Sequence, residues 1–211
     1  MKVLSVNIGE RKKIQWKFKY LETGIFKYEV STPIFLDKKD VDNDNVIDRK
    51  YHGGIDKAVY GFSKRNYQYF KKLHPNIEFY NGIFGENLTF DDLKETETYI
   101  GDVFQIGEAI LQVSQPRIPC FKLGIVFKNQ KIVKDFLNSP YCGFYFRVLQ
   151  SGFVKQADKV KLIKKAKNSM TVAEIFSIHT KNTGNNPFIY KALDLEFLAE
   201  QSKNSIKKRL K

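Results

Sequence analysis

Sulfur-containing side chains are scarce in this chain, which has 2 Cys and 2 Met among its 211 residues. Two cysteines are too few for the disulfide framework of a small secreted domain. The first residues also lack the apolar stretch and the small-residue cleavage site of a signal peptide. We therefore predict a protein of the reducing cytoplasm with free thiols. A disulfide between Cys120 and Cys142 is the alternative that the sequence leaves.

Long apolar runs and cofactor fingerprints are also missing. No run of residues approaches the length needed to span a bilayer, so a membrane is not predicted as a partner. A Gly-x-Gly-x-x-Gly pattern and a cysteine cluster are both absent, which argues against bound flavin, nicotinamide or iron–sulfur centres. Any redox chemistry would then need electrons from a separate reductase.

Positive charge is abundant, with a net charge of +13 and a pI near 9.5. Such a surface attracts anions, for example phosphate-bearing ligands. The lysines are spread along the chain, and no zinc finger, RRM or helix-turn-helix pattern is present. Nucleic acid is therefore an unlikely partner.

Short segments with alternating side chains dominate the first 163 or so residues and predict strands. A Gly107-Glu108 turn is expected between two of them. The pattern predicts a mainly β fold, as a curled antiparallel sheet or barrel. The expected strands are residues 14–20, 103–106, 109–113 and 144–150.

Two helices are expected to cover this sheet. One runs from Ser63 to Leu73, with Ser63 as its cap and Tyr67, Phe70 and Leu73 on one face, and the other lies near residues 131–137. The acidic run 37–48 is predicted to be a polar loop, because the glycine and the terminal glutamate of a calcium-binding EF-hand are absent.

The composition changes after the lysine-rich stretch 161–167. Thr171 and Glu174 have the spacing of a capping box that opens a helix. A break at Asn185-Asn186 precedes Pro187 at the next helix start. A further helix is expected over 194–210, with an apolar stripe formed by Leu195, Leu198, Ala199 and Ile206. We predict a β domain over 1–165 and a small helical unit over 168–211.

Cys120 ends the segment Gln115-Pro116-Arg117-Ile118-Pro119-Cys120. Because proline cannot donate to a central ladder, the cysteine is expected where a strand ends and a loop begins. A thiolate is both a nucleophile and a soft metal ligand, and the nearby Arg117 would favour the ionised form. The alternative is a small buried side chain without chemistry.

Two glycine-containing clusters also suggest a site. In residues 52–60, the Gly53-Gly54 backbone can approach an anion and Lys57 adds a positive charge. His52 is a proton donor, a metal ligand or a structural histidine. In residues 82–89, two glycines bracket an aromatic residue beside Glu86 and Asn87, although this segment alone could be an ordinary turn.

Together these clusters resemble the MOSC domain family, and within it the YiiM type, over almost the whole chain. Their order and spacing carry the resemblance more than any single piece does. The matching segments are His52-Gly53-Gly54 with Asp56 to Tyr60, Phe84 to Thr89, Ile100-Gly101-Asp102, Val113 to Arg117 with Pro119-Cys120, Tyr145 with Arg147-Val148-Leu149, and the tail from Met170.

The resemblance implies a MOSC-type β-barrel with a few covering helices, followed by a small three-helix extension. It further implies binding of the molybdenum cofactor, a pyranopterin with a dithiolene and a phosphate, with Cys120 as the molybdenum ligand. Pyridoxal phosphate is not expected, because the sulfurase domain fused to other MOSC domains is too large for this chain. The expected cofactor-binding residues are Cys120, Arg117, Gly53, Gly54, Lys57, Asn87 and Arg147.

The activity implied by the resemblance is reduction of N-hydroxylated compounds such as 6-hydroxylaminopurine, which detoxifies base analogues. In this hypothesis Cys120, His52 and Glu86 are catalytic, and His52 or Glu86 supplies the proton needed as water leaves, the histidine by virtue of a pKa near neutrality.

Other functions remain open from the sequence. One is a cysteine hydrolase with Cys120 as nucleophile, His52 as base and Asn87 or Asp102 as the orienting group. Another is a non-catalytic carrier that holds the molybdenum cofactor, or sulfur as a persulfide, on Cys120.

Overall fold

The computed structural model describes residues 1–49, 52–181 and 187–210. Its main element is an eight-stranded sheet in the order β12-β8-β9-β10-β6-β7-β1-β4. Neighbouring strands are antiparallel except for the parallel pair β6 and β7. The mainly β class is therefore confirmed. The strands are β1 Val3–Gly9, β4 Lys27–Val30, β6 Val59–Ser63, β7 Leu88–Phe90, β8 Val103–Ile106, β9 Ala109–Pro116, β10 Phe144–Gln150 and β12 Val160–Lys164.

The predicted barrel is not confirmed, because no ladder joins the two ends of this sheet in the described part of the chain. The sheet does curl far enough for Lys2 to form a bridge with Lys159 and for the Val3 N–H to donate to Asp158 O at 3.0 Å. Strand β4 pairs with residues Val6 to Gly9 of β1.

The segment 14–20 does not form the single strand that its alternation predicts. It divides between β2 (Lys12–Trp16) and β3 (Lys19–Thr23), which pair as a hairpin. Lys17 turns the chain with a φ of 53°, and Phe18 is fully exposed. The alternation fails as a predictor here because it continues unchanged through the two-residue reversal. A second small sheet pairs β5 (Ile34–Leu36) with β11 (Gly152–Val154).

The other strand predictions are confirmed. Strands β8 and β9 flank the Gly107-Glu108 turn, and β10 covers residues 144–150. The acidic run 37–48 is a loop, with one isolated bridge between Val41 and Leu36.

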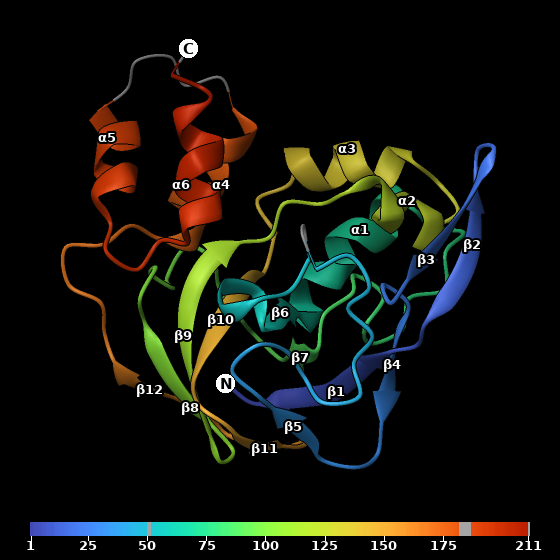
Figure 1. The fold of residues 1–211 in the computed structure, drawn as a ribbon, viewed down its shortest axis with the longest axis horizontal. Coiled ribbons are helices and arrows are strands. Elements are labelled where there is room, and N and C mark those ends of the chain that lie inside the picture. Colours follow the sequence, from blue (N-terminus) through green and yellow to red (C-terminus); the bar gives the residue numbers. More distant parts are fainter. Residues whose placement is uncertain (50–51, 182–186, 211) are drawn as a thin grey trace.

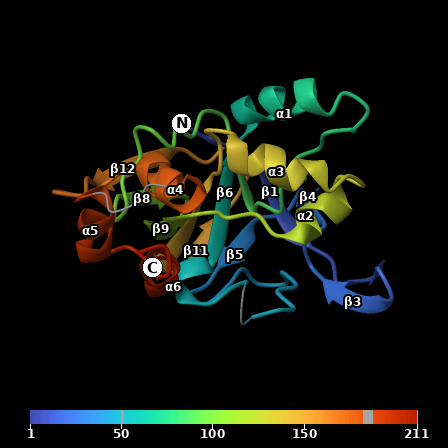
Figure 2. The same ribbon diagram turned by 90° about the horizontal axis from the view of Figure 1, so that it is seen from above.

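Helices α1 (Tyr67–Leu73), α2 (Phe121–Val126) and α3 (Lys131–Asn138) lie together on one side of the main sheet (Figures 1 and 2). Buried aromatic rings fill the space beneath them, for example Phe70 and Phe136 with centroids 5.6 Å apart. Helix α2 is not predicted by the sequence.

The sequence predicts that Ser63 caps a helix. Instead, Ser63 is the last residue of β6, and its side chain makes no capping hydrogen bond. Its hydroxyl accepts a hydrogen bond from the Leu93 N–H at 3.2 Å. A 3-10 turn, η2 (Lys64–Asn66), lies between this strand and α1. Tyr67 and Phe70 are buried as expected, whereas Leu73 is 40% exposed.

Helices α4 (Val172–Thr180), α5 (Pro187–Asp194) and α6 (Glu200–Lys207) gather beyond one end of β9 (Figure 1), and α4 packs against β9. The Thr171–Glu174 capping box is confirmed. Pro187 begins α5, while Asn185-Asn186 lie outside the described residues. The predicted helix over 194–210 is wrong in its first part, because residues 195–199 connect α5 to α6.

The apolar residues of that connection, Leu195, Leu198 and Ala199, are buried without being helical. The predicted domain boundary at 165–168 lies between β12 and α4, and the division into two domains stays a prediction. None of the helices in the described ranges is long and apolar enough to cross a bilayer.

Candidate functional site

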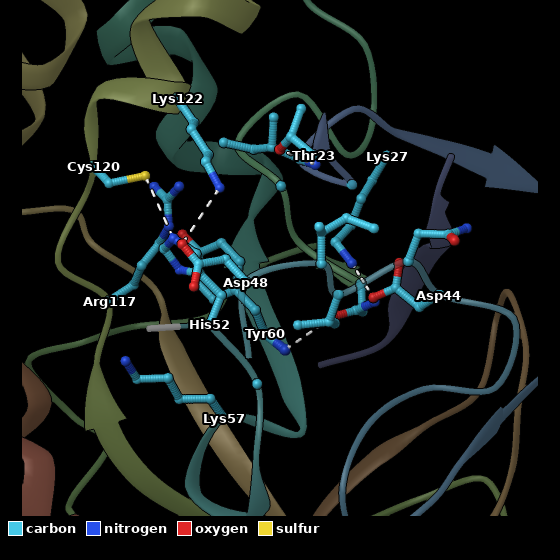
Figure 3. Close-up of a pocket in the computed structure, with 18 of the residues that line it drawn as sticks. Thr23, Lys27, Asp44, Asp48, His52, Lys57, Tyr60, Arg117, Cys120 and Lys122 are labelled. Carbon is cyan, nitrogen blue, oxygen red and sulfur yellow. Dashed lines mark hydrogen bonds and ion pairs between the residues drawn. The ribbon is translucent and has the colours of Figure 1, made fainter. Parts of the chain in front are cut away.

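A cavity of about 100 Å³ opens where the loops at one edge of the main sheet meet the start of α2 (Figure 3). Its walls come from segments far apart in the sequence, so only the folded chain assembles it. The lining residues include Thr23 to Ile25, Lys27, Asp44 to Asp48, His52, Gly53, Lys57, Ala58, Tyr60, Gly85, Asn87, Arg117, Ile118, Cys120, Lys122 and Tyr145.

Cys120 lies at the edge of this cavity, in the position that its proline context predicts. Strand β9 ends at Pro116, and Cys120 is extended (φ −119°, ψ 171°) directly before α2 begins at Phe121. The thiol is half-buried, and its Sγ is 3.8 Å from His52 Nε2. The two residues are 68 positions apart in the chain, and the fold brings them into contact.

Arg117 is a buried cation without a carboxylate partner in the described residues. Its side chain is 5% exposed and lies between the rings of Tyr60 and Phe136, at 5.1 Å and 5.2 Å from their centroids. Its Nη1 has no hydrogen-bond partner there. Because an unsatisfied buried donor on a charged group is costly, the site fits an anionic ligand that accepts from this guanidinium.

His52 is a neutral imidazole at neutral pH. Burial, together with the positive charges of Lys122, Lys57 and Arg117, lowers the pKa of His52 to about 4. The predicted pKa near neutrality is therefore wrong. Against Cys120 the ring acts either as an N–H donor to a thiolate or as an acceptor from a thiol.

The paired glycines both have positive φ angles. Gly53 and Gly54 have φ values of 98° and 84°, which L side chains rarely adopt. Gly53 lines the cavity, and a Cβ there would lie 2.8 Å from Val46 Cγ1. Gly54 caps the 3-10 turn η1 (Ile55–Lys57), and its carbonyl accepts from the Lys57 N–H at 2.8 Å. Lys57 lies 5.7 Å from the Tyr145 ring centroid, and burial lowers its pKa.

Sequence reasoning missed the opposite wall of the cavity. Asp44 forms an ion pair with Lys27 and accepts from Asn87 Nδ2 at 3.0 Å and from the Gly9 N–H at 2.7 Å. Asp44 belongs to the acidic run that the sequence assigns to a polar loop. The placement of Asn87 in this wall, beside the cavity, agrees with its predicted role but does not test it.

Lys122 is a second residue that sequence reasoning missed. It is buried in α2, and its Nζ is 3.9 Å from Asp48 Oδ2. Figure 3 shows Lys122, Cys120 and Arg117 on one side of the cavity and the Lys27–Asp44 pair on the other. A basic residue two positions after the cysteine was the available signal, but the helix that orients it was not predicted.

Glu86 is not among the residues that line the cavity. Its fully buried carboxylate accepts hydrogen bonds from the Tyr67 hydroxyl, the Thr89 hydroxyl and the Gly82 and Phe84 N–H groups. Burial raises its pKa. The carboxylate therefore holds the 82–89 segment against α1 and is not placed to give a proton to a ligand.

Arg147 also lies outside the cavity lining. It forms an ion pair with Asp56, and its Nη1 donates to Gln112 Oε1 at 3.2 Å and to Phe197 O at 2.8 Å. These contacts join β10 to η1 and to the α5–α6 connection. The guanidinium is thus satisfied within the protein, in contrast to that of Arg117.

Among the described residues, the groups proposed to orient His52 in a hydrolase form their hydrogen bonds with other partners. Asn87 Oδ1 accepts from the Tyr60 N–H at 3.2 Å, and its amide donates to Asp44. Asp102 accepts from the N–H groups of Tyr99 and Ala166 and from Lys165. The structure assembles a Cys–His pair without the predicted third member.

The family model of the MOSC domain matches residues 48–161, which include His52, Arg117 and Cys120. This chain therefore belongs to the MOSC domain family.

Within that family the chain is YiiM-like. It is 33% identical to Protein YiiM of Escherichia coli over 158 residues, 74% of this chain and 70% of that protein. The crystal structure of YiiM from Geobacillus stearothermophilus superposes with a TM-score of 0.83 and 28% identity, covering 100% of this chain and 99% of that one. An uncharacterized Bacillus subtilis protein, YflK, is 34% identical over 98% of this chain and 93% of its own length.

Proposed function

We propose that this protein is a molybdenum cofactor-dependent reductase of N-hydroxylated compounds, such as 6-hydroxylaminopurine, and so detoxifies base analogues. Its membership of the MOSC family and its similarity to YiiM support this class. A fungal protein named "Reductase", from Gibberella moniliformis, is 29% identical over 69% of this chain, although the match covers 26% of that longer protein.

The observation that carries the proposal is the orphaned guanidinium of Arg117 beside the Cys120 thiol. The molybdenum cofactor brings a soft metal bound through sulfur and an anionic phosphate. The thiolate of Cys120 suits the metal, while Nη1 of Arg117, which has no partner among the described residues, suits an anionic oxygen. Lys57, Asn87 and the Gly53 backbone line the same cavity and complete the proposed binding set. The residues present therefore fit the cofactor.

Reduction of an N–OH group to an amine breaks the N–O bond, consumes two electrons and two protons, and releases water. When bound, the cofactor supplies the two-electron chemistry. In this proposal His52, whose Nε2 is 3.8 Å from Cys120 Sγ, relays a proton at Nε2. The electrons come from a separate reductase, the proposed protein partner.

The proposal is tested by the molybdenum and pterin content of protein purified anaerobically from a cofactor-competent host. We expect near-stoichiometric molybdenum in the wild type, reduction of 6-hydroxylaminopurine with a chemical electron donor, and loss of both in Cys120→Ala. The matched control is Cys142→Ala, which removes the other thiol at a site outside the cavity. Full activity in Cys120→Ala would contradict the mechanism.

A cysteine hydrolase is the second candidate, favoured by the 3.8 Å contact between Cys120 Sγ and His52 Nε2. This function predicts ester or amide hydrolysis that survives complete removal of molybdenum and is lost in both Cys120→Ala and His52→Ala. A protein that holds the cofactor but reduces nothing with any donor would instead be a carrier.

A further inference from the structure

A second cavity, of about 170 Å³, lies between the MOSC site and the C-terminal helices. It shares four lining residues with the first cavity, namely His52, Lys57, Ile118 and Tyr145. The two cavities therefore adjoin each other at the histidine that contacts Cys120.

The two cavities differ in charge. The first is lined by the ionised side chains of Lys27, Asp44, Asp48, Arg117 and Lys122, whereas none of these lines the second. Apart from Lys57, the second cavity is lined by neutral polar or apolar side chains. The first thus suits an anionic cofactor, and the second suits an uncharged molecule with polar edges.

The strand side of the second cavity has an unsatisfied donor. Gln115 is 4% exposed, and its Nε2 lacks a hydrogen-bond partner in the described residues. Pro116 and Ile118 follow it along the same wall. A buried amide donor beside apolar groups fits a ring whose edge carries a hydrogen-bond acceptor.

The opposite wall comes from α4 and α6. His179 Nε2 and Ser202 Oγ are 2.7 Å apart, and Ser205 lies one turn further along α6. Burial lowers the pKa of His179 to about 4, so the ring is neutral at neutral pH. The α5–α6 connection is fastened to β9 through the Ala199 N–H, which donates to Ser114 O at 3.1 Å, one residue before Gln115.

We propose that this second cavity binds the heterocyclic ring of the substrate, an uncharged planar nitrogen heterocycle of the purine type, with the Gln115 amide donating to a ring acceptor. This inference rests on the proposed function and assigns the C-terminal helices a part in substrate selection. In this arrangement the ring occupies the second cavity and its N–OH group faces His52, which lines both cavities. The cofactor occupies the first, charged cavity.

The test fills the second cavity from its solvent-accessible side. Ser205 is exposed on α6, so Ser205→Trp can fold normally and block the cavity. Asn204→Trp is the matched control, because the neighbouring Asn204 is also exposed but does not line the cavity. Gln115→Met is a second variant that removes the amide donor with little change in volume.

The measurement is a calorimetric titration of each purified protein with 6-hydroxylaminopurine, with molybdenum content determined in parallel. We expect binding at least about tenfold weaker in Ser205→Trp and several-fold weaker in Gln115→Met, and no change in Asn204→Trp. Molybdenum content is expected to be equal in all four proteins.

Two results would overturn the inference: unchanged affinity in both cavity variants, or no binding by the wild type. A failure of the proposed function is recognised separately, because it appears as absence of molybdenum or of reduction in the wild type. Reduction by the wild type with unaltered affinity in Ser205→Trp would retain the reductase and place its substrate elsewhere.

Discussion

The two cysteines lie on the same excursion of the chain, between the end of β9 at Pro116 and the start of β10 at Phe144, yet their surroundings differ. Cys142 is fully buried, and its N–H and that of Gly143 donate to Glu95 Oε1 at 3.0 Å and 2.8 Å. Burial, together with the charge of Glu95, raises the pKa of the Cys142 thiol. Cys120 is half-buried at a cavity wall beside His52.

This contrast between the two thiols indicates which region of the protein can bind a ligand. Around Cys142 the N–H groups of Cys142 and Gly143 donate to Glu95, and the Cys142 carbonyl accepts from the Tyr60 hydroxyl, so these main-chain groups hold the segment in place. Around Cys120 a buried guanidinium retains an unpaired donor in the described residues, which a ligand would satisfy. Arg117 lies near both thiols, but only Cys120 of the two lines the cavity, and this access distinguishes the two regions.

The largest expected effect is on thiol alkylation. With iodoacetamide at pH 8, we expect Cys120 to react on the order of a thousandfold faster than Cys142, because the buried thiol reacts only after the chain opens. Mass spectrometry of peptides over a time course measures both rates. In denaturant the two rates should converge, and comparable rates in the native protein would remove the contrast.

The next effect concerns the stability of the Cys142 region. Glu95→Ala leaves the Cys142 and Gly143 N–H groups and the Asn66 amide without their acceptor, so we expect a loss of about 2–4 kcal/mol in the free energy of unfolding. Urea denaturation measures it. Glu97→Ala, at an exposed site, is the control and should change stability by less than about 0.5 kcal/mol.

The smallest expected change in stability is at the functional region. In cofactor-free protein, Arg117→Met should alter the free energy of unfolding by no more than about 1 kcal/mol, since it removes an unpaired buried charge. Molybdenum retention should nevertheless fall at least about tenfold.

Arg147→Met should behave in the opposite way. It leaves Asp56 without its partner, so we expect a loss of about 2 kcal/mol with molybdenum retention intact. Cofactor loss in Arg147→Met alone would reverse the assignment of the two arginines.

Features set by neighbours in the sequence were predictable. The Gly107-Glu108 hairpin and the strand at 144–150 follow from side-chain alternation and turn residues, and the Thr171–Glu174 box follows from spacing. The single strand predicted over 14–20 was wrong, because the alternation of side chains continues through the two-residue turn between β2 and β3. The helix predicted over 194–210 was wrong in its first part, because Leu195, Leu198 and Ala199 have the spacing of a helical stripe. They are apolar because the connection that contains them is buried.

Residue types alone were enough to predict the mainly β class, the thiol at a strand end beside an arginine, and the order of motifs that resembles a MOSC domain. These depend on residue types and short spacings. Only the tertiary structure decided that Glu86 and Arg147 are satisfied inside the protein, that Asp44 and Lys122 face the cavity, and that His52 is neutral. Desolvation and charge pairing decide those outcomes, and both depend on contacts between residues tens of positions apart in the chain.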